Sequence, residues 1–329
     1  MNVIVTGGAG FIGSHLVEKL LQIKKIKKII VIDCFKNSSI INLKKILKNK
    51  KIFLVKKNIC DKKQILKYFK NCKIVFHLAA IADIVPSIQK PLEYINNNFI
   101  GTLNVLECMR EHKVKKIIYA ASASCYGLTK KFPTNEVEKI DTAYPYAFSK
   151  YTSELAVIHW SKVYRIKYIS LRLFNVYGLR SRTTGAYGAV MGVFLKQKLS
   201  NKPFTVVGDG KQLRDFINVK DVAEAFYKAG FSNVSNKIFN VGTSKPQSVN
   251  RLVSLLKGKS VKIPKRPGEP NKSQAEIKKI KKYLNWQPRI SFKDGVEELK
   301  KNIIYWKTAP LWTSKKISEA TKEWFKYLK

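Results

Sequence analysis

The sequence predicts an α/β fold with a Rossmann-type, doubly wound parallel sheet and a smaller, discontinuous second lobe. One observation is that a short β-branched run, Val3–Val5, leads through closely spaced glycines into a helical pattern, as expected for a strand buried on both faces. The other is that strand-like and helix-like patterns alternate through the first half of the 329 residues. Such alternation produces right-handed βαβ units and a parallel sheet with helices on both faces.

The opening glycines predict a phosphate-binding turn. Gly7 permits the tight turn, Gly10 lets a pyrophosphate approach the backbone, and Gly13 lets helix and strand pack closely. Phe11 and Ile12 begin a helix whose free N–H groups and positive dipole end attract phosphate. Three glycines also occur in ordinary turns, but a strand before them and a helix after them form the context that dinucleotide binding requires.

The second strand, Lys28–Ile32, is followed by Asp33, about twenty residues beyond the glycines. A carboxylate there accepts hydrogen bonds from an adenosine ribose and repels a 2′-phosphate, which favours NAD over NADP. A helix cap or a loop acid is the alternative interpretation of Asp33. The neighbouring glycines favour the cofactor interpretation.

The remaining elements define a two-part organisation. The patterns predict helices near 40–47, 64–69 and 92–111, another from about Tyr144, and strands at 52–55, 74–77, 116–120, 167–171 and 238–241, the last followed by a helix at 249–256. Glycines and prolines become frequent beyond Asn175. We therefore expect a NAD-binding domain from residues 1–174 plus about 213–245, and a substrate-binding lobe from about 175–212 and 246–302. Residues 303–329 are expected to form an aromatic tail packed on the body rather than a binding site.

Composition favours a globular enzyme, with 45% hydrophobic residues. No apolar run approaches the length of a membrane span and no charged leader begins the chain, so we expect a cytoplasmic protein. The five cysteines lack metal-binding or redox spacing and are expected to be reduced and mostly buried. The four histidines form no ligand cluster, so no metal is expected.

The net charge of +41 raises the question of nucleic-acid binding. Lysine supplies most of this excess, whereas base-specific recognition favours arginine. The lysines are spread along the chain, in runs such as Lys24–Lys28 and Lys44–Lys51, and no nucleic-acid-binding motif is visible. We expect a solvated, lysine-rich surface with no specific nucleic-acid partner.

Tyr146 and Lys150 lie four residues apart at the start of a predicted helix and so share one face. A tyrosine with an unperturbed pKa near 10 is a poor base, and a nearby ammonium is expected to lower the pKa of Tyr146. Lys150 is also in position to reach a nicotinamide ribose. The pair arises by chance in many helices, but beside a dinucleotide fold it indicates an acid–base centre.

The chain resembles the extended short-chain dehydrogenase/reductase family, within it the NAD-dependent sugar-nucleotide epimerases and dehydratases, and this resemblance covers nearly all of it. The motifs that carry it are GGAGFIGSH (7–15), HLAA (77–80), NNNFIGTLNVLE (96–107), ASASCYG (121–127), PYAFSK (145–150), RLFNVYG (172–178), GDGKQLRDFINVKDV (208–222) and RPGEP (266–270). So many motifs in the same order are specific for the family and less so for the substrate.

The resemblance implies further cofactor contacts. Asn37 and Ser38 would support the adenosine end. Ala79 and Ala80 would pack against the cofactor, and Asn98 would hold the loop near the nicotinamide. Relatives place an aspartate for the adenine amino group where this chain has Asn58, followed by Ile59. An amide oxygen still accepts that hydrogen bond, so weaker but retained NAD binding is expected. A loop cap is the alternative role of Asn98.

The resemblance also implies a site for a UDP-sugar. Ser122 would hydrogen-bond the sugar hydroxyl beside Tyr146, completing a Ser–Tyr–Lys set, and Ser124 would line the same pocket. The diphosphate would be held by Asn175, Arg214 and Arg266, and a bidentate guanidinium suits it. The alternatives are a loop cap for Asn175 and surface ion pairs for the arginines.

Two segments bear on the sugar. Ala189 and Val190 end TGAYGAV, a segment similar to that of relatives that take N-acetylated UDP-sugars. Ser273 stands where some relatives place a bulky tyrosine that shortens the sugar pocket. A serine there is expected to leave room for an N-acetyl group at C2.

The expected reaction is NAD-dependent 4-epimerisation of a UDP-hexose, acetylated or not, through a transient 4-keto sugar. Ala123 and Ser124 occupy the positions of the acidic pair of the 4,6-dehydratases, so water elimination has no obvious proton donor. A dehydratase, decarboxylase or 4-keto reductase of the same family is the alternative. A nucleotide-binding or RNA-associated protein without activity is another, and the intact Ser–Tyr–Lys set argues against it.

A homodimer is expected from the helices near 92–111 and 144–164, which form a four-helix interface in relatives. The candidate apolar contacts are Ile100, Leu103, Leu106, Leu155 and Ile158. Each of these side chains is equally suited to face its own sheet.

Overall fold

A seven-stranded parallel sheet forms the centre of the computed structural model, which describes residues 1–181 and 190–328. Its order is β11-β6-β5-β4-β1-β2-β3, from β1 (Asn2–Thr6), β2 (Lys28–Asp33), β3 (Ile52–Lys56), β4 (Cys72–His77), β5 (Lys116–Ser122), β6 (Lys167–Leu173) and β11 (Lys237–Val241). The chain builds outward from β1 to β3 and then returns to β4 on the other side of β1. This reversal opens a crevice at the carboxyl ends of β1 and β4, where open α/β sheets bind ligands.

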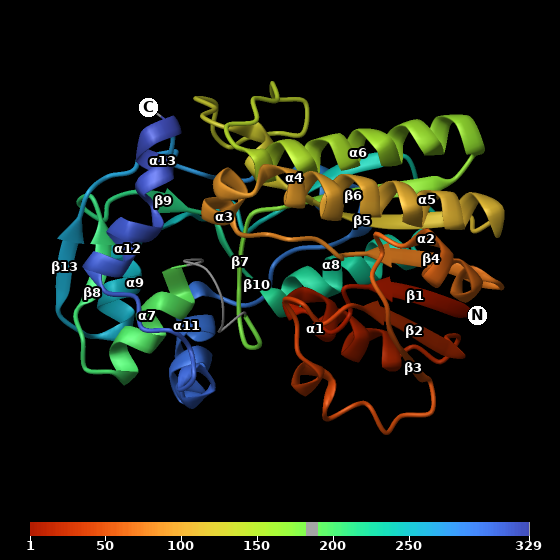
Figure 1. Cartoon of the computed structure of the whole chain (residues 1–329), viewed down its shortest axis with the longest axis horizontal. Coiled ribbons are helices and arrows are strands. Elements are labelled where there is room, and N and C mark those ends of the chain that lie inside the picture. Colours follow the sequence, from red (N-terminus) through yellow and green to blue (C-terminus); the bar gives the residue numbers. More distant parts are fainter. Residues whose placement is uncertain (182–189, 329) are drawn as a thin grey trace.

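Helices cover both faces of this sheet because alternate strand residues point to opposite sides. Val3 and Val5 belong to the core shared with α1 (Phe11–Leu21), α8 (Val219–Phe231) and α10 (Lys278–Leu284). Ile4 belongs to the core shared with α2 (Lys62–Ile65), α5 (Gly101–Glu111) and α6 (Pro145–Tyr164). The doubly wound fold predicted from the alternating pattern is confirmed (Figure 1).

A third core lies beside the carboxyl ends of the strands. Phe194 and Phe204 stack there with ring centroids 4.9 Å apart. Three two-stranded sheets lie around it: β7 (Asn175–Tyr177) with β10 (Phe216–Asn218), β8 (Phe204–Val207) with β13 (Ser260–Ile263), and β9 (Leu213–Arg214) with β12 (Gln247–Ser248). The helices of this region are α7 (Val190–Leu199), α9 (Val249–Leu256), α11 (Phe292–Lys301), α12 (Ser314–Ala320) and α13 (Lys322–Tyr327).

Three predicted helices differ from expectation. The helix expected at 40–47 is a single 3₁₀ turn, η1 (Ile40–Leu43), with Leu43 buried and Ile40 and Ile41 exposed. The helix expected at 64–69 is divided into the end of α2 and a 3₁₀ turn. The helix expected at 92–111 is divided into α4 (Pro91–Tyr94), the π-helical η3 (Ile95–Ile100) and α5. The other short helices are η2 (Leu66–Phe69), α3 (Ile84–Gln89), η4 (Ala123–Tyr126) and η5 (Ile303–Trp306).

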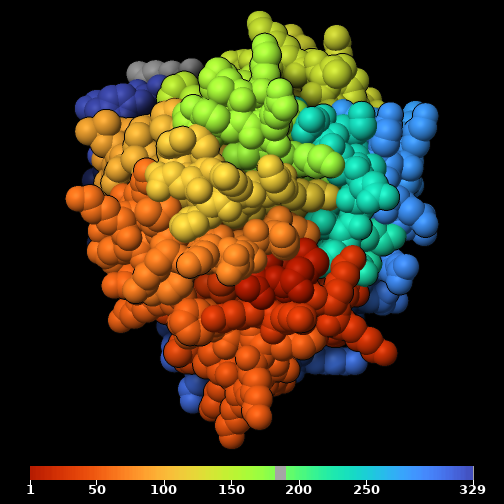
Figure 2. Space-filling model, turned by 90° about the vertical axis from the view of Figure 1, so that its right-hand side faces the viewer, coloured from red at the N-terminus to blue at the C-terminus, as the bar shows by residue number. Residues whose placement is uncertain are grey.

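The candidate dimer helices α5 and α6 lie side by side along one edge of the molecule (Figure 1). Leu106 is fully buried against the sheet, so of the two roles open to it, the interface or its own sheet, the structure shows the second. Leu103 and Ile158 also pack on that core, whereas Ile100 and Leu155 are exposed. Figure 2 views the molecule from the end where β1 begins, with the N-terminal strands in red below segments of these helices in yellow and green.

Candidate active site

A cavity of about 720 Å³ opens at the carboxyl ends of the central strands and extends into the second lobe. Its lining includes nearly every residue that the sequence assigns to a site: Gly7, Gly10, Phe11, Ile12, Gly13, Asp33, Asn37, Ser38, Asn58, Ile59, Ala79, Ala80, Ser122, Ser124, Tyr146, Lys150, Asn175, Val190, Arg214, Arg266 and Ser273. Asn98 lies outside this lining, and Ala189 lies outside the described residues.

The glycine loop is packed so closely that side chains would not fit at some of its positions. Gly7 has φ +69°, a conformation that favours glycine. A Cβ atom on Gly13 would lie 2.1 Å from the carbonyl oxygen of Gly7. Gly10 is the N-cap of α1 and offers no side chain to the first N–H groups of that helix, so these donors remain suited to a phosphate.

Asp33 ends β2 at the same edge of the sheet. Its carboxylate accepts from the backbone N–H groups of Ala9 and Phe35, both at 3.0 Å, and from the Ser38 hydroxyl at 2.6 Å. These donors orient the carboxylate and couple it to the glycine loop. This set of residues fits the NAD that the sequence predicts, and Asp33, expected to bind the ribose of the adenosine, lines the cavity.

Two asparagines show different relations to the cavity. Asn58 lines it, and its Oδ1 accepts from the Cys60 N–H at 3.0 Å. Asn98 is buried, with its Oδ1 accepting from the Ile81 N–H at 2.8 Å and its Nδ2 donating to the Ile81 carbonyl at 3.0 Å. Asn98 therefore does not line the cavity itself. It holds the loop at Ile81, and Ile81 lines the cavity.

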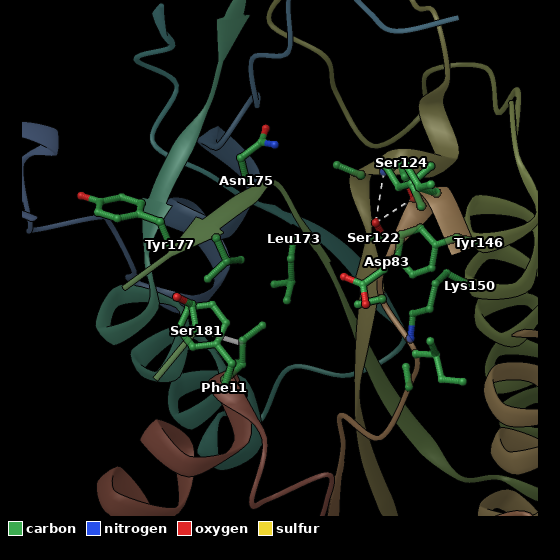
Figure 3. A pocket seen from close by; sticks show the side chains of 18 of the residues that line it. Phe11, Asp83, Ser122, Ser124, Tyr146, Lys150, Leu173, Asn175, Tyr177 and Ser181 are labelled. Atoms are coloured by element: carbon green, nitrogen blue, oxygen red, sulfur yellow. Dashed lines mark hydrogen bonds between the residues drawn. The ribbon is translucent and has the colours of Figure 1, made fainter. Parts of the chain in front are cut away.

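The Ser–Tyr–Lys set lies on one wall of the cavity (Figure 3). Ser122 ends β5, and its hydroxyl shares a 2.8 Å hydrogen bond with that of Ser124. Tyr146 and Lys150 lie on the first turns of α6, which begins after an extended Tyr144 with Pro145 as its first residue. The strand end and the helix start thus place the three side chains together.

The pKa values depart from the sequence expectation. Burial raises the pKa of the Tyr146 phenol, against the influence of the Ser122 hydroxyl, and the charge of Asp83 raises it further. Burial lowers the pKa of Lys150 to about 7, with Glu154 acting in the opposite direction. The pKa of Tyr146 is therefore raised, where the sequence predicted that Lys150 would lower it; burial is the main cause, and Lys150 is not among the groups that shift this pKa.

A buried ion pair anchors the catalytic helix. Glu154, one turn beyond Lys150, bonds the guanidinium of Arg172 on β6 at 2.6 Å and accepts from the Ser170 hydroxyl at 2.7 Å. Arg172 also donates to the Tyr126 hydroxyl at 2.9 Å. Because breaking such a pair leaves an uncompensated buried charge, the network fixes α6 against the sheet.

The cavity lining also includes the arginines predicted to hold a diphosphate. Arg214 donates to Oε1 of Glu269 at 2.8 Å and to the Pro270 carbonyl at 2.7 Å. Arg266 lies 3.8 Å from the other carboxylate oxygen of Glu269. One glutamate thus gathers both guanidinium groups beside the cavity. Glu269 lies in the RPGEP motif (266–270), but the sequence did not predict a role for it.

The serine predicted to open the sugar pocket is hydrogen-bonded on the same side. The Ser273 hydroxyl donates to Oδ1 of Asn175 at 3.1 Å and accepts from the Asp215 N–H at 3.3 Å. Figure 3 shows Asn175 and Tyr177 across the cavity from Tyr146 and Lys150. The substrate side therefore faces the Ser–Tyr–Lys set.

The C-terminal segment contributes to the cavity in a way the sequence analysis missed. Trp306, Trp312 and Trp324 all line it, although they were assigned to a tail packed on the body. Trp306 and Trp324 are also buried in the third core. The aromatic content was the available signal, but nothing in the local sequence shows which surface such residues meet.

Three further findings concern metal-binding groups, membrane spans and cysteines in the described part of the chain. Residues 1–181 and 190–328 contain no group of three or more histidine, cysteine or acidic residues placed to hold a metal ion. Among the same residues, no helix combines the length and apolarity needed to cross a bilayer. All five cysteines are free, with Cys72, Cys108 and Cys125 buried.

Comparisons with known proteins agree with this geometry. The model of the NAD dependent epimerase/dehydratase family matches residues 3–242. The chain is 36% identical over 312 residues to a Methanocaldococcus jannaschii protein named, provisionally, as a UDP-glucose 4-epimerase, with 92% of this chain and 97% of that protein covered.

Solved structures are similar over a comparable length. UDP-glucose 4-epimerase of Thermotoga maritima with UDP-glucose superposes with a TM-score of 0.85 at 34% identity, covering 92% of this chain and all of the other. UDP-N-acetylglucosamine 4-epimerase of Methanobrevibacter ruminantium, in complex with UDP-N-acetylmuramic acid, gives 0.84 at 30% identity, covering 93% and 98%.

Proposed function

Because the chain belongs to the NAD-dependent epimerase/dehydratase family and uses NAD, we propose that it interconverts UDP-hexoses that differ in configuration at C4. The observation that carries this proposal is the Ser122–Tyr146–Lys150 set on one wall of a cavity whose other end is the glycine loop. NAD, when bound, supplies a reversible hydride acceptor. The substrate is oxidised to a 4-keto sugar and then reduced on the other face.

The protein side chains handle the proton. Tyr146 removes the proton of the C4 hydroxyl and returns it at the end of the cycle, and Ser122 holds the same hydroxyl in place. Protonated Lys150, one turn along α6, would favour the phenolate, although burial remains the largest influence on the pKa of Tyr146. Since burial brings the pKa of Lys150 to about 7, its charge changes within the neutral range.

Dehydration is disfavoured by the residues around the serine. Ala123 and Ser124 follow Ser122 on η4, so neither position supplies a carboxyl group to protonate a leaving hydroxyl. Epimerisation requires no such acid. The 4-keto sugar is then retained and reduced instead of losing water.

The sugar pocket suits a substituent at C2. Ser273 is small, and its hydroxyl is engaged with Asn175. We therefore propose that UDP-GlcNAc and UDP-GalNAc are accepted as well as, or instead of, UDP-Glc and UDP-Gal.

The assay is incubation of the purified enzyme with each of the four UDP-sugars, followed by separation of isomers. The expected result is interconversion at C4 with no net production of NADH. Loss of water or carbon dioxide from the sugar, or consumption of NADH, would replace epimerisation with one of the other reactions of the family.

We also propose a homodimer through α5 and α6. Ile100, Phe148 and Leu155 are apolar and from 39% to 50% exposed on this edge. Leu155→Lys is expected to convert the dimer to monomers in light scattering, because a charge would be buried at the interface. Val137→Lys, at an exposed loop position, is the matched control. An unchanged mass for the Leu155 variant would exclude this interface.

A further inference from the structure

Residues 303–328, here called the C-terminal strap, join both parts of the molecule around the cavity. At its start, the Tyr305 hydroxyl donates to Oδ1 of Asn42 in the sheet domain at 3.3 Å. Farther on, the Trp312 carbonyl accepts from Nε2 of Gln197 on α7 at 2.8 Å. At its end α13 lies against α3 (Figure 1), whose first residues, Ile84 and Val85, line the cavity. The C-terminal strap therefore contacts both parts of the molecule next to the cavity.

Trp324 on α13 makes the most specific contacts of the strap. It is 3% exposed and lines the cavity. Its indole N–H donates to the Pro267 carbonyl at 2.7 Å, and its ring lies 5.8 Å from the guanidinium carbon of Arg266. The Trp324 side chain thus contacts both the backbone of the turn at Pro267 and the guanidinium group of Arg266.

The other edge of Trp324 faces the catalytic helix. Its ring centroid lies 6.1 Å from that of Tyr144, the residue that precedes α6. Tyr144 is two positions before Tyr146. Trp324 therefore lies between the arginine turn and the start of the helix that bears the catalytic tyrosine.

We propose that Trp324 is a positioning residue that fixes Arg266 for the diphosphate of the nucleotide-sugar substrate. A buried aromatic face attracts a guanidinium, and the hydrogen bond to Pro267 keeps the turn from rotating away. A long side chain held in its binding geometry loses less conformational freedom when the substrate arrives. The inference rests on the proposed function only in assigning Arg266 to the diphosphate.

The test measures binding of UDP, with dTDP alongside, by titration calorimetry on the NAD-loaded full-length protein. Trp324→Leu keeps an apolar side chain, though a smaller one, without a π face or donor, and it is expected to weaken binding of the preferred nucleotide about tenfold. Trp324→Phe keeps one aromatic ring and loses the donor, so a smaller loss of about threefold is expected. Tyr327→Ala, on the same helix but 61% exposed, is the control and should bind as the wild type does.

A double-mutant cycle separates positioning from general support of the fold. Combining Trp324→Leu with Arg266→Ala is expected to weaken binding no more than Arg266→Ala alone, since one acts through the other. Bound NAD should be unchanged throughout.

Additive effects, equal losses of NAD and nucleotide, near-wild-type binding by both Trp324 variants, or no nucleotide binding by the wild type would each overturn the inference. Binding that follows the expected pattern in a protein that epimerises none of the UDP-sugars would instead leave the inference standing and remove the proposed reaction.

Discussion

The two halves of the cavity are built in opposite ways. The cofactor half comes largely from one short stretch, in which the glycine loop, Asp33 and Ser38 lie within 32 residues and bond to each other. The substrate half brings together β7, β9, the turn at 266–273 and the C-terminal strap. Local spacing determines the first half, and packing between distant segments determines the second.

The two halves also differ in which groups hold their charged side chains in place. In the cofactor half, Asp33 is oriented by neighbouring N–H and O–H donors. In the substrate half, Arg214 and Glu269 meet across 55 residues of sequence. The first half is therefore expected to tolerate changes in the second, and the substitutions of Tyr146 and Gly13 below test this independence.

The largest effect is expected where the two halves meet. Tyr146→Phe removes the phenolic oxygen that moves the proton, so turnover should fall by about three to four orders of magnitude. The ring and its packing against Tyr94, with centroids 6.4 Å apart, remain. The measurement is the rate of UDP-sugar isomerisation together with the amount of bound NAD.

Bound NAD should be retained in this variant, because its contacts come from the other half of the cavity. Turnover at the wild-type rate would remove Tyr146 from its role. Loss of turnover together with loss of NAD would show that the two halves are coupled through α6.

Lys150 gives a second test through stability. Its pKa is about 7 in the fold, against an ordinary value of 10.5, because burial disfavours the charged form. Between these values the unfolded chain binds the extra proton, so the contribution of Lys150 to the free energy of unfolding rises from pH 7 to pH 10.5. Below pH 7 the buried ammonium costs on the order of 3–5 kcal/mol.

Lys150→Met should therefore be more stable than the wild type in urea denaturation at pH 6, and this advantage should shrink as pH rises toward 10. Comparing the two proteins at each pH cancels the titration of the other lysines. An advantage that is constant with pH would mean that Lys150 is not desolvated as the structure indicates.

The same division explains what the sequence could predict. The alternating strands and helices, the glycine loop and Asp33 were predicted because each depends on short-range spacing and backbone geometry. The homology of the motifs identified Arg214 and Arg266, but not the Glu269 carboxylate between them. The strap could not be placed, because aromatic residues in a C-terminal segment carry no information about which surface they cover.

A smaller effect is expected from Gly13→Ala in the cofactor half. The added Cβ would lie 2.1 Å from the Gly7 carbonyl oxygen, so the loop must shift away from its phosphate-binding shape. NAD affinity, measured by calorimetry on the cofactor-free protein, should fall about a hundredfold. Ser14→Ala, the next residue on α1, adds no atom to the loop and is the matched control.

UDP affinity should change little in Gly13→Ala, because Arg214 is held by Glu269 and Pro270, which are not part of the glycine loop. A parallel loss of UDP binding would contradict the independence of the two halves. Unchanged NAD affinity would show that the close packing of Gly13 is not needed for the cofactor.

The smallest and most selective effect is expected from Ser273→Tyr in the substrate half. A tyrosine would occupy the space beside Asn175 that the serine leaves open, and it would remove the hydrogen bond between these side chains. Activity on UDP-GlcNAc and UDP-GalNAc should fall about tenfold relative to UDP-Glc and UDP-Gal, within the range that a steric mismatch of this size supplies. Ser273→Ala removes the same hydroxyl without adding bulk, so it separates the lost hydrogen bond from the filled space. Equal losses on both pairs of sugars in the tyrosine variant would mean that residue 273 positions Asn175 and the chain around it, and that the acetyl group is accommodated elsewhere in the cavity.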